Sequence, residues 1–133
     1  MTAEFEYEKR KFIRLPIAVP VRYKFLSREI RGQDMEDVHE GVSQNIGAGG
    51  LMLRGKLPDT AWLSKLLTRK MFVGINLLLP NSDRPVKALC RVSWSSAIEN
   101  DQGLVVMGLE FQEITNEDRD LITTYIIKAQ MPS

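Results

Sequence analysis

The chain has 133 residues, of which 44% are hydrophobic and 26% are charged, and these values are ordinary for one folded soluble domain. A single cysteine and a single histidine exclude an internal disulfide and argue against a zinc site within one chain. No apolar run is long enough to cross a bilayer, and the acidic N-terminus lacks the apolar segment of a signal peptide. We therefore expect a cytoplasmic protein that does not interact with membranes.

The net charge is only +1, but the basic residues are unevenly distributed. Segment 9–31 contains eight lysines and arginines against a single acid, Glu29, whereas segments 34–40 and 99–120 are acidic. This distribution predicts one anion-binding face. It does not predict direct binding to nucleic acid, which requires a broad basic surface.

The first eight residues show no strand or turn pattern, so we expect a flexible lead-in over 1–8 and a single domain over 9–129. Apolar alternation and turn signals predict six short strands, over 18–25, 38–45, 51–54, 72–79, 86–95 and 104–111. In the fifth of these, alternation places Cys90, Val92 and Trp94 on one apolar face.

Two helices are also expected. Asp59 could cap a short helix that carries Trp62 and Leu66 at helical spacing. Thr115 precedes acidic residues and is expected to begin a C-terminal helix with an apolar stripe. Because the strands are closely spaced and no strand–helix–strand alternation is present, the sequence predicts an antiparallel barrel or sandwich.

No set of residues in the sequence supports catalysis. The only histidine, His39, lies in an acidic polar loop and is expected to be solvated. Cys90 lies on the apolar face of a predicted strand, where packing is its expected role. Ser43 lacks the nucleophile-elbow context, and the acids of 34–40 and 117–120 are expected to be solvated charges. The chain is therefore not expected to be an enzyme.

Two features do carry binding chemistry. Arg10 and Arg14 are four residues apart directly after Lys9, and a guanidinium group matches the O6 and N7 atoms of guanine and pairs with phosphate. The segment Asn45-x-Gly47-x-x-Gly50 joins an amide that donates and accepts hydrogen bonds to glycines that allow close backbone approach. Taken alone, each also has a plain structural explanation, as a solvated basic run and a glycine-rich hairpin.

Together, in this order and at this separation, the two features resemble the signature of the PilZ domain, which carries RxxxR and then [D/N]xSxxG. Arg10 and Arg14 complete the first motif. Asn45 and Gly50 match the second, whereas Gly47 replaces its serine. Weaker similarities make the resemblance span residues 8–127, and they lie at 15–23, 90–94 and 107–111.

The resemblance implies a six-stranded antiparallel split β-barrel with a short inserted helix and a C-terminal α-helix. It also implies a bacterial receptor for the second messenger cyclic di-GMP, without a metal or cofactor. Arg10 and Arg14 would then clamp the ligand, Asn45 would read a guanine and Gly50 would give backbone room.

The roles of three further candidate site residues stay open. Lys9 stands where an arginine is frequent and could contact a phosphate. Trp94 either supplies a ring beside the ligand or packs in the barrel core. Gly47 lacks the serine hydroxyl, and the loss of one hydrogen bond costs about 0.5–1.5 kcal/mol.

The sequence thus leaves alternative functions open. In the first, ligand binding orders the N-terminal arginine segment and signals to a protein partner of unknown identity. In the second, the chain is a degenerate PilZ-like adaptor that binds a protein without nucleotide. Gly47 also leaves room for a sensor of a related cyclic dinucleotide.

Overall fold

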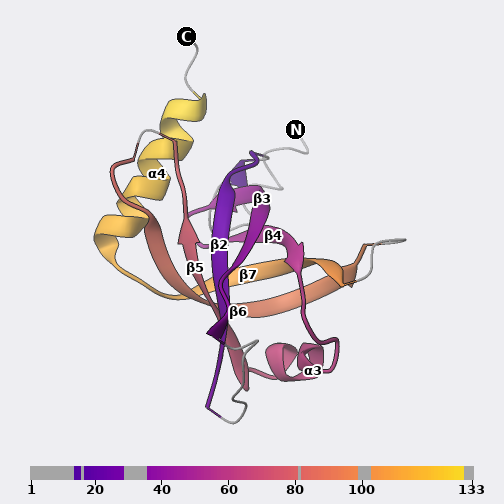
Figure 1. Ribbon diagram of the computed structural model, residues 1–133. Helices are drawn as coiled ribbons and strands as arrows, with labels where there is room; N and C mark the ends of the chain where they lie inside the picture. The colour runs from indigo at the N-terminus through magenta and orange to yellow at the C-terminus, as the bar shows by residue number, and fades with distance from the viewer. Residues whose placement is uncertain (1–13, 16, 29–35, 81, 99–102, 131–133) are drawn as a thin grey trace, which may run out of the picture.

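The structure, a computed structural model, describes residues 14–15, 17–28, 36–80, 82–98 and 103–130. Its strands form one antiparallel sheet in the order β1-β3-β2-β5-β6-β7-β4, and pairing of β3 with β4 closes this sheet into a barrel (Figure 1). The strands are β1 (Arg14–Leu15), β2 (Pro20–Ser27), β3 (His39–Gly47), β4 (Gly50–Lys56), β5 (Met71–Leu77), β6 (Val86–Ala97) and β7 (Leu104–Ile114). The helices are α3 (Trp62–Leu67) and α4 (Asn116–Gln130).

The six-stranded antiparallel barrel with an inserted helix and a C-terminal helix is confirmed. Each of the six expected strands is present, and β1 adds a two-residue pairing with β3. Strands β4, β6 and β7 run beyond their expected apolar patterns, whereas β2 begins and β5 ends two residues inside the expected ranges. Strand ends follow the pairing with neighbours and are defined only to within one or two residues.

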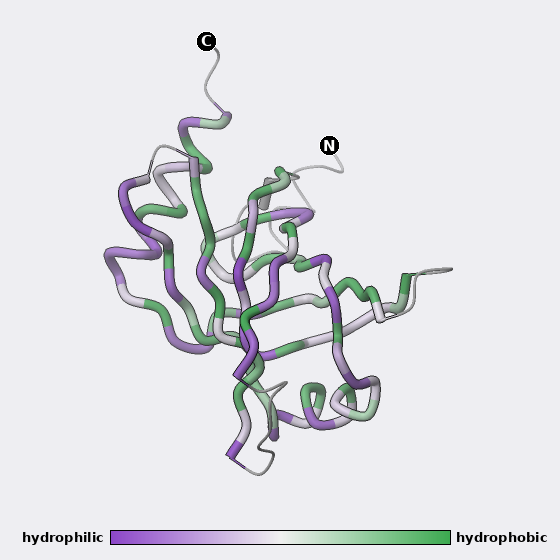
Figure 2. Tube along the Cα trace, in the orientation of Figure 1, coloured by the Kyte–Doolittle hydropathy of each residue, from purple (hydrophilic) through white to green (hydrophobic). Residues whose placement is uncertain are grey.

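The core fills the barrel interior with side chains that alternate along each strand. On β2, Val21, Tyr23 and Phe25 are buried, whereas the residues between them face outward. The hydropathy along the chain shows the same alternation of apolar and polar positions (Figure 2). This period of two is the reason why the strands could be located from the sequence.

The two helices lie on opposite sides of the barrel (Figure 1). Helix α3 buries Trp62, whose ring packs against Phe25 at a centroid distance of 5.3 Å. The Asp59 carboxylate accepts a hydrogen bond from the backbone N–H of Ala61, so Asp59 precedes the helix and does not itself cap it. Helix α4 buries Ile122 and Ile126 against the core.

The start of α4 is tied to the turn before β6. The Asp118 backbone N–H donates to Thr115 Oγ1 over 3.1 Å, which confirms Thr115 as the capping residue. The expectation that Asp118 is solvated is wrong, since its carboxylate is only 4% exposed. That carboxylate binds the Arg84 guanidinium and accepts the Lys87 backbone N–H. Asp118 therefore acts as a structural brace between α4 and β6.

Ser43 fixes the segment between β1 and β2 onto β3. Its buried hydroxyl accepts the Val19 backbone N–H and donates to the Ile17 carbonyl, both over 2.9 Å. The Ser43 backbone N–H in turn donates to the Val19 carbonyl. The sequence motifs gave no indication of this role, because Ser43 contacts a segment 24 residues earlier in the chain.

We expect Ser43→Ala to lower the free energy of unfolding by about 1–3 kcal/mol, because it leaves buried backbone groups of Val19 and Ile17 without partners. Urea denaturation measures this change. The matched control is Ser96→Ala on exposed β6 surface, where a change within about 0.5 kcal/mol is expected. Equal effects of the two substitutions would contradict the anchoring role of Ser43.

Candidate functional site

A row of outward positions crosses four strands of the barrel. Asn45 on β3 pairs with Met52 on β4, Met52 pairs with Gly108 on β7, and Gly108 pairs with Trp94 on β6. Ile46, which follows Asn45, is buried, and so are the residues on either side of Met52 and of Gly108. The register thus brings two of the predicted site residues, Asn45 and Trp94, onto one outer surface, here called the Asn45–Trp94 row.

A β-bulge turns Asn45 outward. The register of β3 against β4 shifts between Ser43 and Asn45, so Gln44 is the extra residue. Ser43 and Ile46 are both buried, although three positions separate them, and strict alternation would not allow this. Because a bulge inserts one residue and re-aims the side chains that follow, Asn45 lies outside the core.

A second bulge turns Trp94 outward. The register of β6 against β7 shifts between Val92 and Trp94, and Ser93 is the extra residue. Val92 is buried, whereas Trp94 is 41% exposed. The expectation that Trp94 shares an apolar face with Cys90 and Val92 is therefore wrong, because strict alternation ends at this bulge. Of the two alternatives for Trp94, packing in the core or a ring on the surface, the structure shows the ring on the surface.

Gly108 provides the floor on which the Trp94 ring lies. A Cβ atom placed on Gly108 would lie 2.2 Å from Trp94 Nε1, closer than any side chain permits. The hydroxyl of Ser93 donates to the Gly108 carbonyl over 3.1 Å and fixes the bulge beside this glycine. One ring face is thus held against the backbone of β7, and the indole is partly open to solvent.

The Asn45 amide has unused hydrogen-bonding capacity. Its Nδ2 contacts Met52 Sδ at 2.9 Å, and thioether sulfur is a weak acceptor. Its Oδ1 is buried and has no partner among the described residues. An unpaired buried acceptor costs about 1–3 kcal/mol, and such a group calls for an explanation in function or in a missing partner.

The backbone of the predicted arginine motif reaches this surface at Arg14. Arg14 and Gly47 are paired positions of β1 and β3, and Gly47 lies two residues beyond Asn45. Lys9 and Arg10 lie outside the described residues. The anchoring of Val19 and Ile17 by Ser43 holds the chain that follows β1 against β3, and it therefore helps to fix this register.

The two glycines of the second motif lie in the β3–β4 hairpin, and Gly50 occupies a tight position there. A Cβ atom on Gly50 would lie 2.1 Å from the Leu109 carbonyl oxygen, which is backbone and cannot move aside. Gly50 therefore allows β4 to approach β7, and the fold alone requires it. Gly47 is buried at the end of β3, opposite Arg14.

An ion pair that neither sequence motif indicates borders the row. Arg91 on β6 and Glu110 on β7 are paired positions, and their side chains form a salt bridge. Glu110 is also the partner of Gly50 on β4. In the sequence, this pair was indicated only by the position of Arg91 on the outward face of the alternating strand. Arg91 is 24% exposed and therefore presents part of a cation beside the row.

The remaining candidate reactive groups are placed for packing. Cys90 is buried, and this burial raises the pKa of its thiol to about 12, so the thiol stays neutral. His39 is not solvated as expected, because its ring packs against Tyr23 at 5.3 Å and Phe25 at 5.6 Å. Among the residues that the structure describes, no cluster of three metal-ligating side chains occurs. No helix of this described part is long and apolar enough to span a membrane.

Several solved structures share the fold of this chain. The Bacillus subtilis inhibitor of motility MotI/DgrA matches with a TM-score of 0.67 and 19% identity, over 91% of this chain and 51% of that one. MrkH, a c-di-GMP-dependent transcription regulatory factor, matches with a TM-score of 0.64 and 14% identity, over 93% and 52%. The chain thus spans about half the length of these two proteins.

The PilZ domain of Escherichia coli YcgR, solved with c-di-GMP, matches with a TM-score of 0.57 and 10% identity, over 91% of this chain and 90% of that one. At these identities the likeness shows a shared fold. No curated protein sequence matches the chain. The PilZ domain model, in contrast, matches residues 8–128, which is nearly the whole chain. The chain therefore belongs to the PilZ domain family.

Proposed function

We propose that this chain is a receptor for cyclic di-GMP and binds it on the Asn45–Trp94 row. The observation that carries this proposal is the unpaired Asn45 Oδ1 on the same surface row as an exposed tryptophan ring. The backbone of Arg14 lies beside that row. The YcgR domain that shares this fold was solved with c-di-GMP, which supports the same ligand class here.

Each group on the row suits one part of a guanine dinucleotide. A guanine offers N–H donors on its Watson–Crick edge. The Asn45 Oδ1 has no partner among the described residues and would accept one of these N–H groups once the amide turns out of its buried position. The Trp94 indole offers a flat face for a base, and such stacking contributes about 1–3 kcal/mol. Arg10 and Arg14 would supply forked donors for guanine or phosphate, and Lys9 would add a point charge.

Ligand binding is proposed to order the N-terminal arginine segment over the row. The segment would then present a new surface, through which the domain signals to a protein partner. Ser43 gives this segment a fixed base, because it anchors residues 17 and 19 to the strand that carries Asn45. The role of the chain is thus binding, with no chemical step.

Gly47 sets the expected strength of binding. It occupies the position of the family's serine and pairs with Arg14, so one hydroxyl contact is missing directly beside the arginine motif. A lost hydrogen bond of about 0.5–1.5 kcal/mol corresponds to a several-fold change in affinity. A related cyclic dinucleotide with different base edges is the alternative ligand that this substitution favours.

Isothermal titration calorimetry tests the arginine clamp. We expect wild-type protein to bind cyclic di-GMP, and Arg10→Ala or Arg14→Ala to weaken binding by about tenfold or more, because each removes a charge-assisted fork. Arg69→Ala, in the turn before β5 and away from the row, is the control and should bind like wild type. Equal affinities in all four proteins would reject the clamp, and no binding of any cyclic dinucleotide would favour the adaptor alternative.

Gly108→Ala tests the surface position of the Trp94 ring. The added Cβ overlaps the indole, which must swing away from β7, so affinity for cyclic di-GMP should fall by about tenfold through lost stacking. Gly74→Ala on β5 is the matched control, because the nearest atom to its Cβ is the end of a leucine side chain at 3.3 Å. A ligand affinity unaffected by Gly108→Ala would show that the ring does not take part in binding.

A further inference from the structure

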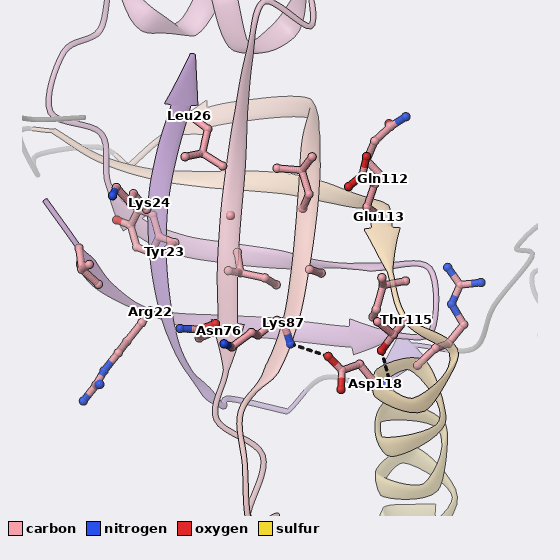
Figure 3. A pocket seen from close by; sticks show the side chains of 17 residues that line it. Arg22, Tyr23, Lys24, Leu26, Asn76, Lys87, Gln112, Glu113, Thr115 and Asp118 are labelled. Carbon is pink, nitrogen blue, oxygen red and sulfur yellow. Dashed lines mark hydrogen bonds between the residues drawn. The ribbon is translucent and has the colours of Figure 1, made fainter. Parts of the chain in front are cut away.

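A second concave surface lies on the outer face of β2, β5 and β6, beside the start of α4 (Figure 3). Its volume is about 880 Å³. We call it the Gly74 groove, after the residue at its floor. Strand β6 serves both surfaces, because Lys87 near its start lines this groove whereas Trp94 near its end lies on the Asn45–Trp94 row. Strand β7 also serves both surfaces, since Glu113 lines the groove and Gly108 lies on the row. The two surfaces therefore share two strands but no residue.

The floor of the groove is bare because Gly74 has no side chain. Gly74 is an outward position in the middle of β5, between Lys24 on β2 and Leu89 on β6. The fold does not require a glycine there. A Cβ on Gly74 would meet Leu26 Cδ1 at 3.3 Å and the Lys24 carbonyl oxygen at an ordinary 3.9 Å, so a small shift of the leucine end would make room. A Cβ on Gly50 would instead collide with backbone. The register of β5 shows no shift at Gly74, so this glycine does not serve a bulge. Close approach of a ligand or of another backbone is a further reason for a glycine inside a strand.

Cations line the groove. Arg22 and Lys24 project from β2, and Lys87 projects from β6 (Figure 3). Lys24 and Lys87 form no ion pair with any residue that the structure describes. Arg22 has only a long contact of 3.6 Å with exposed Glu40, and such surface pairs contribute little. The nearby Asp118 does not neutralise them, since Arg84 already pairs with its carboxylate.

Exposed apolar side chains flank the same surface. Leu26 on β2 is 39% exposed and Val38, just before β3, is 61% exposed. Both line the groove, and Leu26 lies at the side of the bare floor. An apolar flank beside unpaired cations suits a ligand that carries both an apolar group and negative charge.

We propose that the Gly74 groove binds an acidic segment of a partner protein, with one apolar side chain over Gly74 against Leu26 and carboxylates beside Lys24 and Lys87. Glu113 on β7 is an exposed carboxylate of the same lining, and the cations of β2 and β6 outnumber it. Charge complementarity therefore selects an acidic partner, because opposite charges steer association. The proposal does not depend on cyclic di-GMP, since the groove lies apart from the Asn45–Trp94 row. The groove would give the domain a surface for binding a downstream protein.

The test is a titration of isotope-labelled protein, followed by NMR amide shifts. The probe is a capped synthetic peptide with one leucine between runs of glutamate and aspartate. We expect shifts that centre on Gly74, Lys24 and Leu89. The same peptide with glutamine and asparagine in place of the acids should bind about tenfold more weakly, because the charge attraction is lost.

Three variants separate binding at the groove from general charge effects. Gly74→Val fills the floor and should weaken peptide binding about tenfold without lowering the melting temperature, because valine suits a strand better than glycine. Lys24→Glu should also weaken binding about tenfold, whereas Lys70→Glu, the same charge change in the exposed turn before β5, should have less than about a twofold effect.

Shifts that centre elsewhere, or equal losses for Lys24→Glu and Lys70→Glu, would overturn the proposal. A variant that lacks residues 2–8 is titrated in parallel, because this segment is itself acidic and contains Phe5 and Tyr7. If only this shortened chain binds the peptide, the occupant is the chain's own N-terminus and the partner assignment fails. Cyclic di-GMP affinity is measured for Lys24→Glu as well, and an unchanged value keeps this outcome separate from the proposed function.

Discussion

The candidate site depends on two departures from strict alternation in the barrel strands. In a closed barrel, every strand has one face in the core, and a side chain on the wrong face is buried. Strict alternation after Ser43 would place the Asn45 amide in the core, where an unpaired amide is costly. Strict alternation after Val92 would likewise bury Trp94.

The bulges at Gln44 and Ser93 each add one residue, and the strand register then brings both side chains onto one outer row. Gly108 completes this arrangement, because its missing side chain leaves room for the indole.

Much of the fold could be predicted from the sequence, because it depends on local patterns. Apolar alternation located the strands, and Thr115 with the acids after it located the start of α4. The face of Trp94 could not be predicted, because the apolar pattern of β6 continues unchanged into the bulge. Asp118 was expected to be solvated, and its partner Arg84 lies 34 residues earlier in the chain. Such long-range contacts leave no periodic signal. In the same way, the pairing of Arg14 with Gly47 joins two distant segments of the chain and could not be read from either motif alone.

The structure also separates two roles that the glycine-rich motif combines. Gly50 is required by the close approach of β4 to the Leu109 carbonyl, and this constraint holds with or without a ligand. Asn45 differs from Gly50, because the fold provides no hydrogen-bond partner for its Oδ1 among the described residues. A buried acceptor without a partner costs free energy, and in the proposed function a donor from the ligand would remove this cost. The part of the motif that the barrel needs and the part that a ligand would use are thus different residues.

The central claim is that cyclic di-GMP binds on the Asn45–Trp94 row, and intermolecular NMR contacts test it most directly. The account predicts nuclear Overhauser effects between guanine protons and the Trp94 indole, together with shifts of the Asn45 side-chain amide and the Gly108 backbone amide. The second tryptophan, Trp62, is buried at α3 and should show neither contacts nor shifts. Saturation with cyclic di-GMP that leaves the Asn45 and Trp94 side-chain resonances unchanged would contradict the account.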